Sequence, residues 1–335
     1  MTADESIPVG MAGLRYPITQ VSLVVDDIDV LLAAYHRAFG WAPWQDFDHV
    51  PPVHHNEMYR GRSVRYSLRG AEVYVGSLNF ELLKPLPGGE SLFHDHLRER
   101  GEGIASIASM FHERADGDAV KAAFREEFGL GILNKADIGD HIEYFYIDTQ
   151  ADFGCPIESG SGHAIDFVGP ARIYPHPGAT FGPSPVSGIT YRVAAVTLVV
   201  DDLESRLTNY RKAFGWSPWE RLDGRDGAAI ADATYGGRPT TFDIRRARTV
   251  VGDTTFEIVE PRDDGNPWAA SHARHGDGLM SVTVSPVGPA TLGDVVRQFE
   301  ADGIGLVASA RIGGAEWCLL DTVGRFKTAI AVESG

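Results

Sequence analysis

The feature that most constrains the fold of this chain is a long internal repeat. The segment VSLVVDD at 21–27 returns as VTLVVDD at 196–202, an offset of 175 residues. The decapeptide YHRAFGWAPW at 35–44 returns as YRKAFGWSPW at 210–219, with seven of ten positions identical. Matches of this length at a constant offset indicate two copies of one structural unit.

Shorter matches follow in the same order along the chain. The segment FELLKP at 80–85 corresponds to FEIVEP at 256–261, and GEGIAS at 101–106 corresponds to GDGLMS at 276–281. The order of the segments and their near-constant spacing predict two complete copies of about 150 residues each, the size of an ordinary domain.

The stretch between the two copies has a different composition. It contains GPSP and several further proline and glycine residues, which are typical of a connecting segment. We therefore predict an N-terminal domain at 15–170, a Pro/Gly-rich linker at 171–189, and a C-terminal domain at 190–335.

Each repeat begins with a strand and continues with a helix. Apolar Val21, Leu23 and Val25 recur at every second position, which is the period of a strand. The segments 119–129 and 293–303 each predict a second helix, with strands before and after it. The pattern predicts an α+β fold of four βαβββ units, two in each domain, whose sheets have concave inner faces.

Charge and cysteine content exclude several classes of protein. Thirty basic residues against 46 acidic residues give a net charge of −16, which argues against binding to nucleic acid or to an anionic membrane surface. Cys155 and Cys318 are too few for a disulfide framework. Neither a signal-peptide pattern nor an apolar run of about 18 residues occurs. We therefore expect a cytoplasmic protein, as a monomer or a homodimer.

Four motifs coincide in the first repeat. They are the strand ending VVDD, the helix ending Y-x-x-x-F-G-W, the strand FELLKP followed by RGEGI, and D-T-x-x-D-x-G-x-x-x-E at 148–158. In these motifs the chain resembles a tandem two-domain member of the vicinal oxygen chelate (glyoxalase/bleomycin-resistance/dioxygenase) superfamily. The first repeat is most similar to methylmalonyl-CoA epimerase-type members. The resemblance implies a site on the inner face of a curled sheet, where the family usually holds a divalent metal.

The resemblance also implies which positions would hold that metal. In the first repeat, Gln20 stands where the family has a histidine on the first strand, and Ser106 stands where it has a second histidine. Glu81 and Glu158 match the two carboxylate positions. The first repeat thus keeps both carboxylates and loses both histidines.

In the second repeat the same four positions are Ala195, Glu257, Ser281 and Ala331. The tandem dioxygenases that the chain resembles hold iron in their second domain, on two histidines and a glutamate. Those ligands are missing here, which argues against iron-dependent ring cleavage in the second repeat. We predict that the site of the C-terminal domain is degenerate and that this domain has a structural role. The active site is then expected in the cup formed by the concave face of the N-terminal domain.

Two interpretations of the first repeat stay open. Gln20, Glu81 and Glu158 form an all-oxygen set that would suit one divalent ion such as Mg²⁺ or Mn²⁺. Without a metal, two carboxyl groups in an apolar cup would repel each other, and one pKa would rise until the group acts as an acid or base near neutral pH.

Further residues are candidates for contact with a substrate. His54 and His55 are read either as a substitute ligand or base, or as part of a polar loop, and Ser106 is read as a packing residue more than a reactive one. The full set of predicted substrate-binding residues is Gln20, Ser106, His54, His55, Tyr59, Tyr66, His141 and Tyr144.

The sequence favours an isomerase-, epimerase- or lyase-like enzyme that acts on a small molecule. It would move a proton α to the carbonyl of a bulky acyl or aromatic keto substrate, with Glu158 and Glu81 as the catalytic pair. One alternative is a non-catalytic protein that binds or sequesters a small molecule. The other is a metal-dependent lyase or dioxygenase with His54 or His55 as a substitute ligand.

Overall fold

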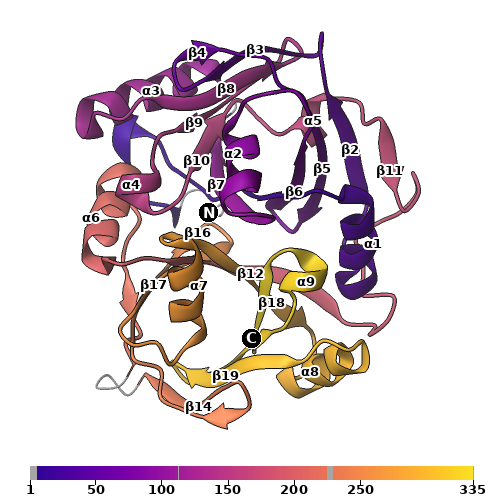
Figure 1. The fold of residues 1–335 in the computed structure, drawn as a ribbon, viewed down its shortest axis with the longest axis vertical. Helices are drawn as coiled ribbons and strands as arrows, with labels where there is room; N and C mark the ends of the chain where they lie inside the picture. Colours follow the sequence, from indigo (N-terminus) through magenta and orange to yellow (C-terminus); the bar gives the residue numbers. More distant parts are fainter. Residues whose placement is uncertain (1–5, 112, 225–228, 335) are drawn as a thin grey trace.

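The computed structural model describes residues 6–111, 113–224 and 229–334, which form two similar halves (Figure 1). The elements of the first half are η2 (Met11–Gly13), β1 (Gln20–Val24), α1 (Ile28–Phe39), β2 (Trp44–His49), β3 (His54–Tyr59), β4 (Arg62–Ser63), β5 (Leu68–Val75), β6 (Leu78–Pro85), α2 (Leu92–Glu99), β7 (Gly103–Met110), α3 (Arg114–Phe128), β8 (Ile132–Ile138), β9 (Ile142–Ile147), α4 (Gln150–Phe153), β10 (Ile157–Gly160), α5 (Ala164–Phe167) and β11 (Arg172–Tyr174).

The second half repeats this order of helices and strands, without counterparts of η2, α5 and β11 among the described residues. Its elements are β12 (Thr190–Val199), α6 (Leu203–Phe214), β13 (Glu220–Arg221), β14 (Ile230–Tyr235), β15 (Arg238–Pro239), β16 (Ile244–Val251), β17 (Thr254–Pro261), α7 (Pro267–His275), β18 (Gly278–Val287), α8 (Leu292–Ala301), β19 (Leu306–Ile312), β20 (Ala315–Leu320), α9 (Val323–Phe326) and β21 (Ala329–Glu333).

Each half forms one sheet, and the two sheets share one strand order, except that the first has the additional edge strand β11. The first sheet has the order β11-β2-β5-β6-β1-β7-β10-β9-β8-β3-β4, and the second has the order β13-β16-β17-β12-β18-β21-β20-β19-β14-β15. The units β1-α1-β2-β5-β6 and β7-α3-β8-β9-β10 join where β1 pairs antiparallel with β7. The second half has the equivalent units, joined where β12 pairs with β18. The predicted α+β fold of four βαβββ units is confirmed.

Two strand pairings were not predicted from the sequence. The hairpin β3–β4 lies within the first unit along the chain, but β3 pairs with β8 at the far end of the sheet. The strand β11 lies within the predicted linker and pairs antiparallel with β2. Both pairings connect parts of the domain that are distant in sequence.

The repeated helices begin and end for the same local reasons. The side chain of Asp27 accepts a hydrogen bond from the backbone N–H of Val30 at 3.2 Å, which caps the start of α1, and Asp202 caps α6 in the same way. Gly40 and Gly215 end these helices with φ of 72° and 71°, a conformation that favours glycine. The DD and FG motifs of the repeat are therefore helix boundaries.

A shared apolar core joins the two halves. The Tyr35 hydroxyl of α1 donates to the carbonyl of Phe326 in the second half at 2.9 Å. The equivalent Tyr210 hydroxyl of α6 donates to the carbonyl of Phe153 in the first half at 3.1 Å. Each repeated tyrosine thus crosses the interface, and the two halves pack with approximate twofold symmetry.

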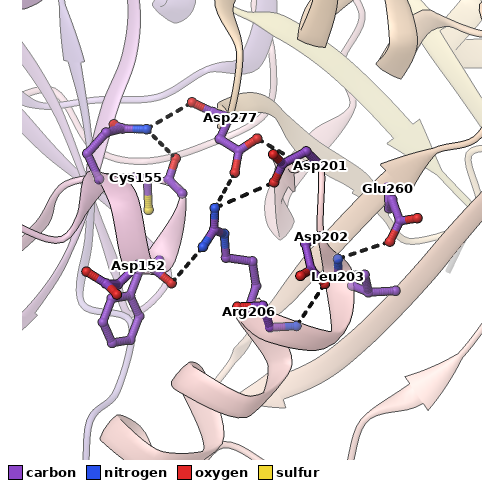
Figure 2. A network of polar contacts seen from close by, with 12 residues as sticks. Asp152, Cys155, Asp201, Asp202, Leu203, Arg206, Glu260 and Asp277 are labelled. Carbon is purple, nitrogen blue, oxygen red and sulfur yellow. Dashed lines mark hydrogen bonds and ion pairs between the residues drawn. The ribbon is translucent and has the colours of Figure 1, made fainter. Parts of the chain in front are cut away.

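Polar contacts around Asp277 close one side of this interface (Figure 2). Arg206 donates to the Asp277 carboxylate at 2.7 Å and to the carbonyl of Asp152 at 3.1 Å. Gln150 of the first half donates to the Asp277 carbonyl at 3.0 Å. These contacts fix the position of the loop that follows α7 against the first half.

The helices α2 and α7 lie within the curl of the first and second sheet (Figure 1). Phe93 of α2 and Trp268 of α7 are buried in the respective inner clusters of apolar side chains. In the part of the chain that the structure describes, no helix has both the length and the apolar character needed to cross a membrane.

Candidate active site

The candidate site lies on the concave face of the first sheet, called here the N-terminal cup. Gln20 comes from β1, Glu81 from β6 and Glu158 from β10, and their side chains line one cavity. All three residues are buried, with exposed fractions of 2%, 7% and 5%. The structure therefore brings together three residues that the sequence indicated.

A fourth acidic residue, Glu72, belongs to the same group. It lies directly across the β5–β6 ladder from Glu81. Glu72 accepts hydrogen bonds from the Asn79 amide at 2.8 Å and from the backbone N–H of Ile165 at 3.2 Å. Glu81 accepts one from the Ser22 hydroxyl at 2.6 Å. Each carboxyl is thus held by neutral donors.

Glu158 and Gln20 also line the cavity of the cup. The Tyr146 hydroxyl donates to Glu158 Oε2 at 2.7 Å. Gln20 Nε2 donates to Asn79 Oδ1 at 3.4 Å, and Gln20 Oε1 has no hydrogen-bond partner within the described residues. A buried acceptor without a partner is uncommon, and this one is available to a donor group of a ligand.

Burial raises the pKa of all three carboxyl groups. The pKa of Glu72 rises to about 7 and that of Glu158 to about 8. The pKa of Glu81 lies well above its ordinary value, first because of burial and then because Glu72 and Glu158 lie nearby. No salt bridge from a described Lys or Arg reaches these groups. The cluster therefore keeps protons at neutral pH.

Beside the acids, the cup contains a second polar network. His54 Nε2 lies 2.9 Å from the Tyr144 hydroxyl, which lies 2.9 Å from the Tyr66 hydroxyl. His54 Nδ1 lies 3.2 Å from the Tyr66 carbonyl and 3.4 Å from Glu57 Oε1. Both ring nitrogens of His54 are occupied, and burial lowers its pKa. His54 does not itself border the cavity, and we interpret it as a residue that holds Tyr144, which does.

Of the eight predicted substrate-binding residues, only Gln20 and Tyr144 border the cavity of the cup. His55 follows His54 along β3 and so points to the opposite side of the strand. Tyr59 donates its hydroxyl to Asp95 and borders a different cavity between the two halves. His141 lies exposed in the turn before β9. Ser106 is buried on β7 opposite Ser22.

The cup is small, and a larger cavity adjoins it. The space among its side chains measures about 30 Å³, which is room for one water-sized group. Met110, Gly162 and His163 border both this space and a neighbouring cavity of about 520 Å³, called here the outer cavity. Burial lowers the pKa of His163 to about 4, so its ring is neutral at pH 7. The outer cavity is the route by which a ligand would reach the acids.

The sequence interpretation missed Glu72 and His163. A signal for Glu72 existed, because a two-residue turn at Gly76–Ser77 sets the register of the β5–β6 hairpin and places Glu72 opposite Glu81. For His163 there was no comparable signal. It follows β10 in a loop, and only the packing of that loop against the cup gives it a place there.

The comparisons with known proteins bear on the fold. No protein-family model matches the chain, and no curated protein matches it in sequence. A solved structure of a mutant 4-hydroxymandelate synthase from Streptomyces coelicolor aligns with 96% of this chain and 92% of its own, at a TM-score of 0.58 and 14% identity. The chain has the tandem vicinal oxygen chelate fold.

A second tandem structure agrees with this assignment. A xylose isomerase-like TIM barrel/4-hydroxyphenylpyruvate dioxygenase fusion protein aligns with 98% of this chain and 50% of its own, at a TM-score of 0.53 and 12% identity. At such identities the vicinal oxygen chelate assignment describes the fold, and activity has to be argued from the residues of the site.

The metal that this fold usually holds can be tested against the residues present. The four family positions contain the amide of Gln20, the hydroxyl of Ser106 and the carboxyls of Glu81 and Glu158. Within the described residues, no three His, Cys, Asp or Glu side chains are placed together to hold a metal ion. The residues do not fit the metal centre, and we derive no step through one.

The equivalent face of the second sheet, called here the C-terminal cup, differs in its charges. Glu257 keeps the position of Glu81, and Thr197 donates to it at 3.1 Å. Arg246, which is 2% exposed, also donates to Glu257 and forms a buried ion pair with it. The carboxylate of the C-terminal cup is therefore paired with a cation, whereas Glu81 is not.

Proposed function

We propose that the N-terminal cup moves a proton at the carbon next to a carbonyl group, with Glu158 and Glu81 as the acid–base pair. The observation that carries the proposal is the buried carboxyl cluster of Glu72, Glu81 and Glu158 around one small cavity. Carboxyl groups with pKa values near the working pH can both accept and release protons.

The pKa values suggest which carboxyl group acts as the base and which acts as the acid. Glu158, with a pKa of about 8, changes its protonation in the physiological range and is our candidate for the base. Tyr146 donates to it and so stabilises its charged form. Glu81 has its pKa raised by both neighbouring carboxyls, so it keeps its proton and can donate it to the carbonyl oxygen as negative charge develops there.

The outer cavity suggests the class of substrate. Tyr74, Phe111 and Phe167 give it an aromatic wall. We infer a substrate whose carbonyl end enters the cup while a bulky acyl or aromatic body lies in the outer cavity. Met110 and His163 separate the two spaces, and they must turn aside for the carbonyl end to enter. The unbranched side chain of Met110 suits that task.

The second candidate function is binding without catalysis, and the size of the cup favours it. A space of about 30 Å³ does not hold a carbonyl group together with its α-carbon unless side chains move. A metal-dependent lyase or dioxygenase with His54 as a ligand has less support, because both ring nitrogens of His54 already have partners.

The two functions are distinguished by proton exchange in deuterated water. A panel of aryl and acyl keto acids is incubated with the protein, and loss of the α-proton signal is followed by NMR. We expect catalysed exchange, reduced about 100-fold or more in Glu158→Gln. Glu99→Gln on the exposed part of α2 is the matched control and should exchange normally.

Two outcomes would contradict the acid–base proposal. Full exchange in Glu158→Gln would show that this carboxyl is not the base. Saturable binding of a panel member, without exchange in the unmodified protein, would favour the binding function.

A further inference from the structure

Two related cavities lie at the interface between the halves, outside both cups. The first interface cavity, of about 560 Å³, lies beside α2, and the second, of about 290 Å³, lies beside α7. Tyr59 of the first corresponds to Tyr235 of the second in the repeat. Ile104 and the equivalent Leu279 border both cavities, so the two cavities meet at the axis that relates the repeats.

The two cavities have different charges. The first contains Asp95 and Glu99 of α2, and Asp95 forms an ion pair with Arg60 at 3.1 Å. In the second repeat, 175 residues later, Asp95 is replaced by Ala270 and Glu99 by Arg274. Gly236 replaces Arg60, so the second repeat has lost two acids and one cation and has gained the cation Arg274 at its interface cavity.

The cations of the second cavity are largely without counter-ions. Lys327 pairs with Glu102 at 2.8 Å. Arg100 reaches from the first half and donates to the Asp277 carbonyl at 3.1 Å, which leaves its charge unpaired. Arg274 has no side-chain hydrogen bond or ion pair within the described residues, and Asp321 is the other acid of the lining. Unpaired cations stand out in a chain with a net charge of −16.

The two histidines of this cavity report the same excess of positive charge. The pKa of His96 is lowered to about 4, first by burial and then by the nearby charges of Arg100 and His275. Burial also lowers the pKa of His275, with Arg274 and Arg100 as further causes. Nearby positive charge that is not balanced by acids disfavours protonation of an imidazole. The cavity therefore favours an anion.

Part of the lining of the second interface cavity is apolar. It is formed by Leu279, Met280, Val307 and Leu319, together with the ring of Tyr235. An apolar wall facing a few convergent polar groups is the usual composition of a small-molecule site. A fully hydrated inorganic ion would leave this wall unused.

We propose that the second interface cavity binds one small organic anion with an apolar body, such as an aryl carboxylate, with Arg274 and Arg100 holding the carboxylate. Arginine presents N–H groups in a planar fork that matches a carboxylate. The site uses residues of both halves, so it exists only in the assembled tandem chain. It is separate from the acids of the N-terminal cup, and its test does not depend on the proposed proton transfer.

The experiment compares two probes that share one apolar body. Binding of 2-naphthoate and of the neutral 2-naphthamide to the full-length protein is measured by isothermal titration calorimetry. We expect saturable binding of one naphthoate at this site, and about tenfold weaker binding of the amide, because the amide carries no charge for the arginines. Arg274→Gln should weaken naphthoate by about tenfold and leave the amide unchanged.

Arg60→Gln is the matched control, because Arg60 lies in the first interface cavity. It should leave naphthoate affinity unchanged, and circular dichroism should show the same fold in both variants, since both side chains are at the surface. Equal affinity for the two probes would overturn the proposal, as would naphthoate binding that is insensitive to Arg274→Gln. A loss of affinity in Arg60→Gln alone would place the anion in the other cavity and also overturn it.

Discussion

The N-terminal and C-terminal cups hold the same acid in different surroundings. Glu81 and Glu257 occupy equivalent strand positions, and a hydroxyl donates to each of them, from Ser22 and Thr197. In the second cup Arg246 adds a buried positive charge. The first repeat has Gly70 at that position, where a Cβ would lie 2.9 Å from a nitrogen of the His49 ring.

This difference shows how one fold can give an acid two roles. A buried carboxyl without a cation stays neutral, and its proton is then available for chemistry. A buried carboxyl paired with arginine stays charged and is held in place by its partner. Reactivity is therefore expected in the first cup and a structural role in the second. The predictions below change one cup at a time.

The largest effect is expected from breaking the ion pair of the C-terminal cup. Arg246→Met leaves Glu257 buried without its cation, which should lower the free energy of unfolding by about 3–5 kcal/mol. Urea denaturation followed by tryptophan fluorescence measures the change. A loss below about 1 kcal/mol would show that the pair contributes little.

The double variant Arg246→Met/Glu257→Gln is the control for that experiment. It removes both charges and should recover most of the lost stability, because no unpaired charge is left in the cup. If the double variant is as unstable as the single one, the loss comes from packing of the arginine side chain.

A smaller effect is expected from pH acting on the N-terminal cup. Glu72 and Glu158 have pKa values of about 7 and about 8 in the folded chain, against an ordinary value of 4.5. Between pH 4.5 and about pH 8 the folded state therefore binds more protons than the unfolded state. The stability from these groups is fully present below about pH 4.5 and is lost as the pH rises through 7 and 8.

Denaturation midpoints at pH 5 and pH 8 measure this loss. We expect the part due to Glu158 to be of the order of 1–3 kcal/mol, and Glu158→Gln should remove it, because an amide does not titrate. If the variant and the unmodified protein have the same dependence on pH, Glu158 does not have a raised pKa.

Removing one hydroxyl from the network beside the acids should change the free energy of unfolding by about 1 kcal/mol. Tyr144→Phe removes the group that connects His54 and Tyr66. The second cup has Trp317 at this position, stacked on Trp268. The variant should lose about 1 kcal/mol of stability, measured by thermal unfolding. A loss above about 3 kcal/mol would indicate that the hydroxyl organises the whole cup.

The smallest effect is expected from metal ions. Because Gln20 and Ser106 stand where the resemblance to the superfamily would place histidine ligands, we expect sub-stoichiometric metal in the purified protein. Added Mg²⁺ or Mn²⁺ should not shift the unfolding temperature, whereas a bound ion would raise it. One equivalent of metal by elemental mass spectrometry, lost in Glu81→Ala/Glu158→Ala, would contradict this and establish a metal site.

The sequence by itself determined the repeat, the strand and helix order, and the ends of the helices. These features depend on local rules. The two-residue period of Val21 and Leu23 predicts a strand, and the structure buries that strand on both faces. Asp27 and Gly40 cap a helix through groups only a few residues away. The resemblance to the vicinal oxygen chelate superfamily also implied Gln20, Glu81 and Glu158, which the fold brings to one cavity.

Only the tertiary structure decided which residues surround those acids. His54 reaches Tyr144 at the wall of the cup because β3 pairs with β8 across the sheet. Arg246 enters the other cup from a strand position where the first repeat has a glycine. Arg100 belongs to the first half and Arg274 to the second, so only the packing of the two halves brings both to the second interface cavity. Such contacts depend on how distant surfaces become buried together, and local periodicity carries no information about that.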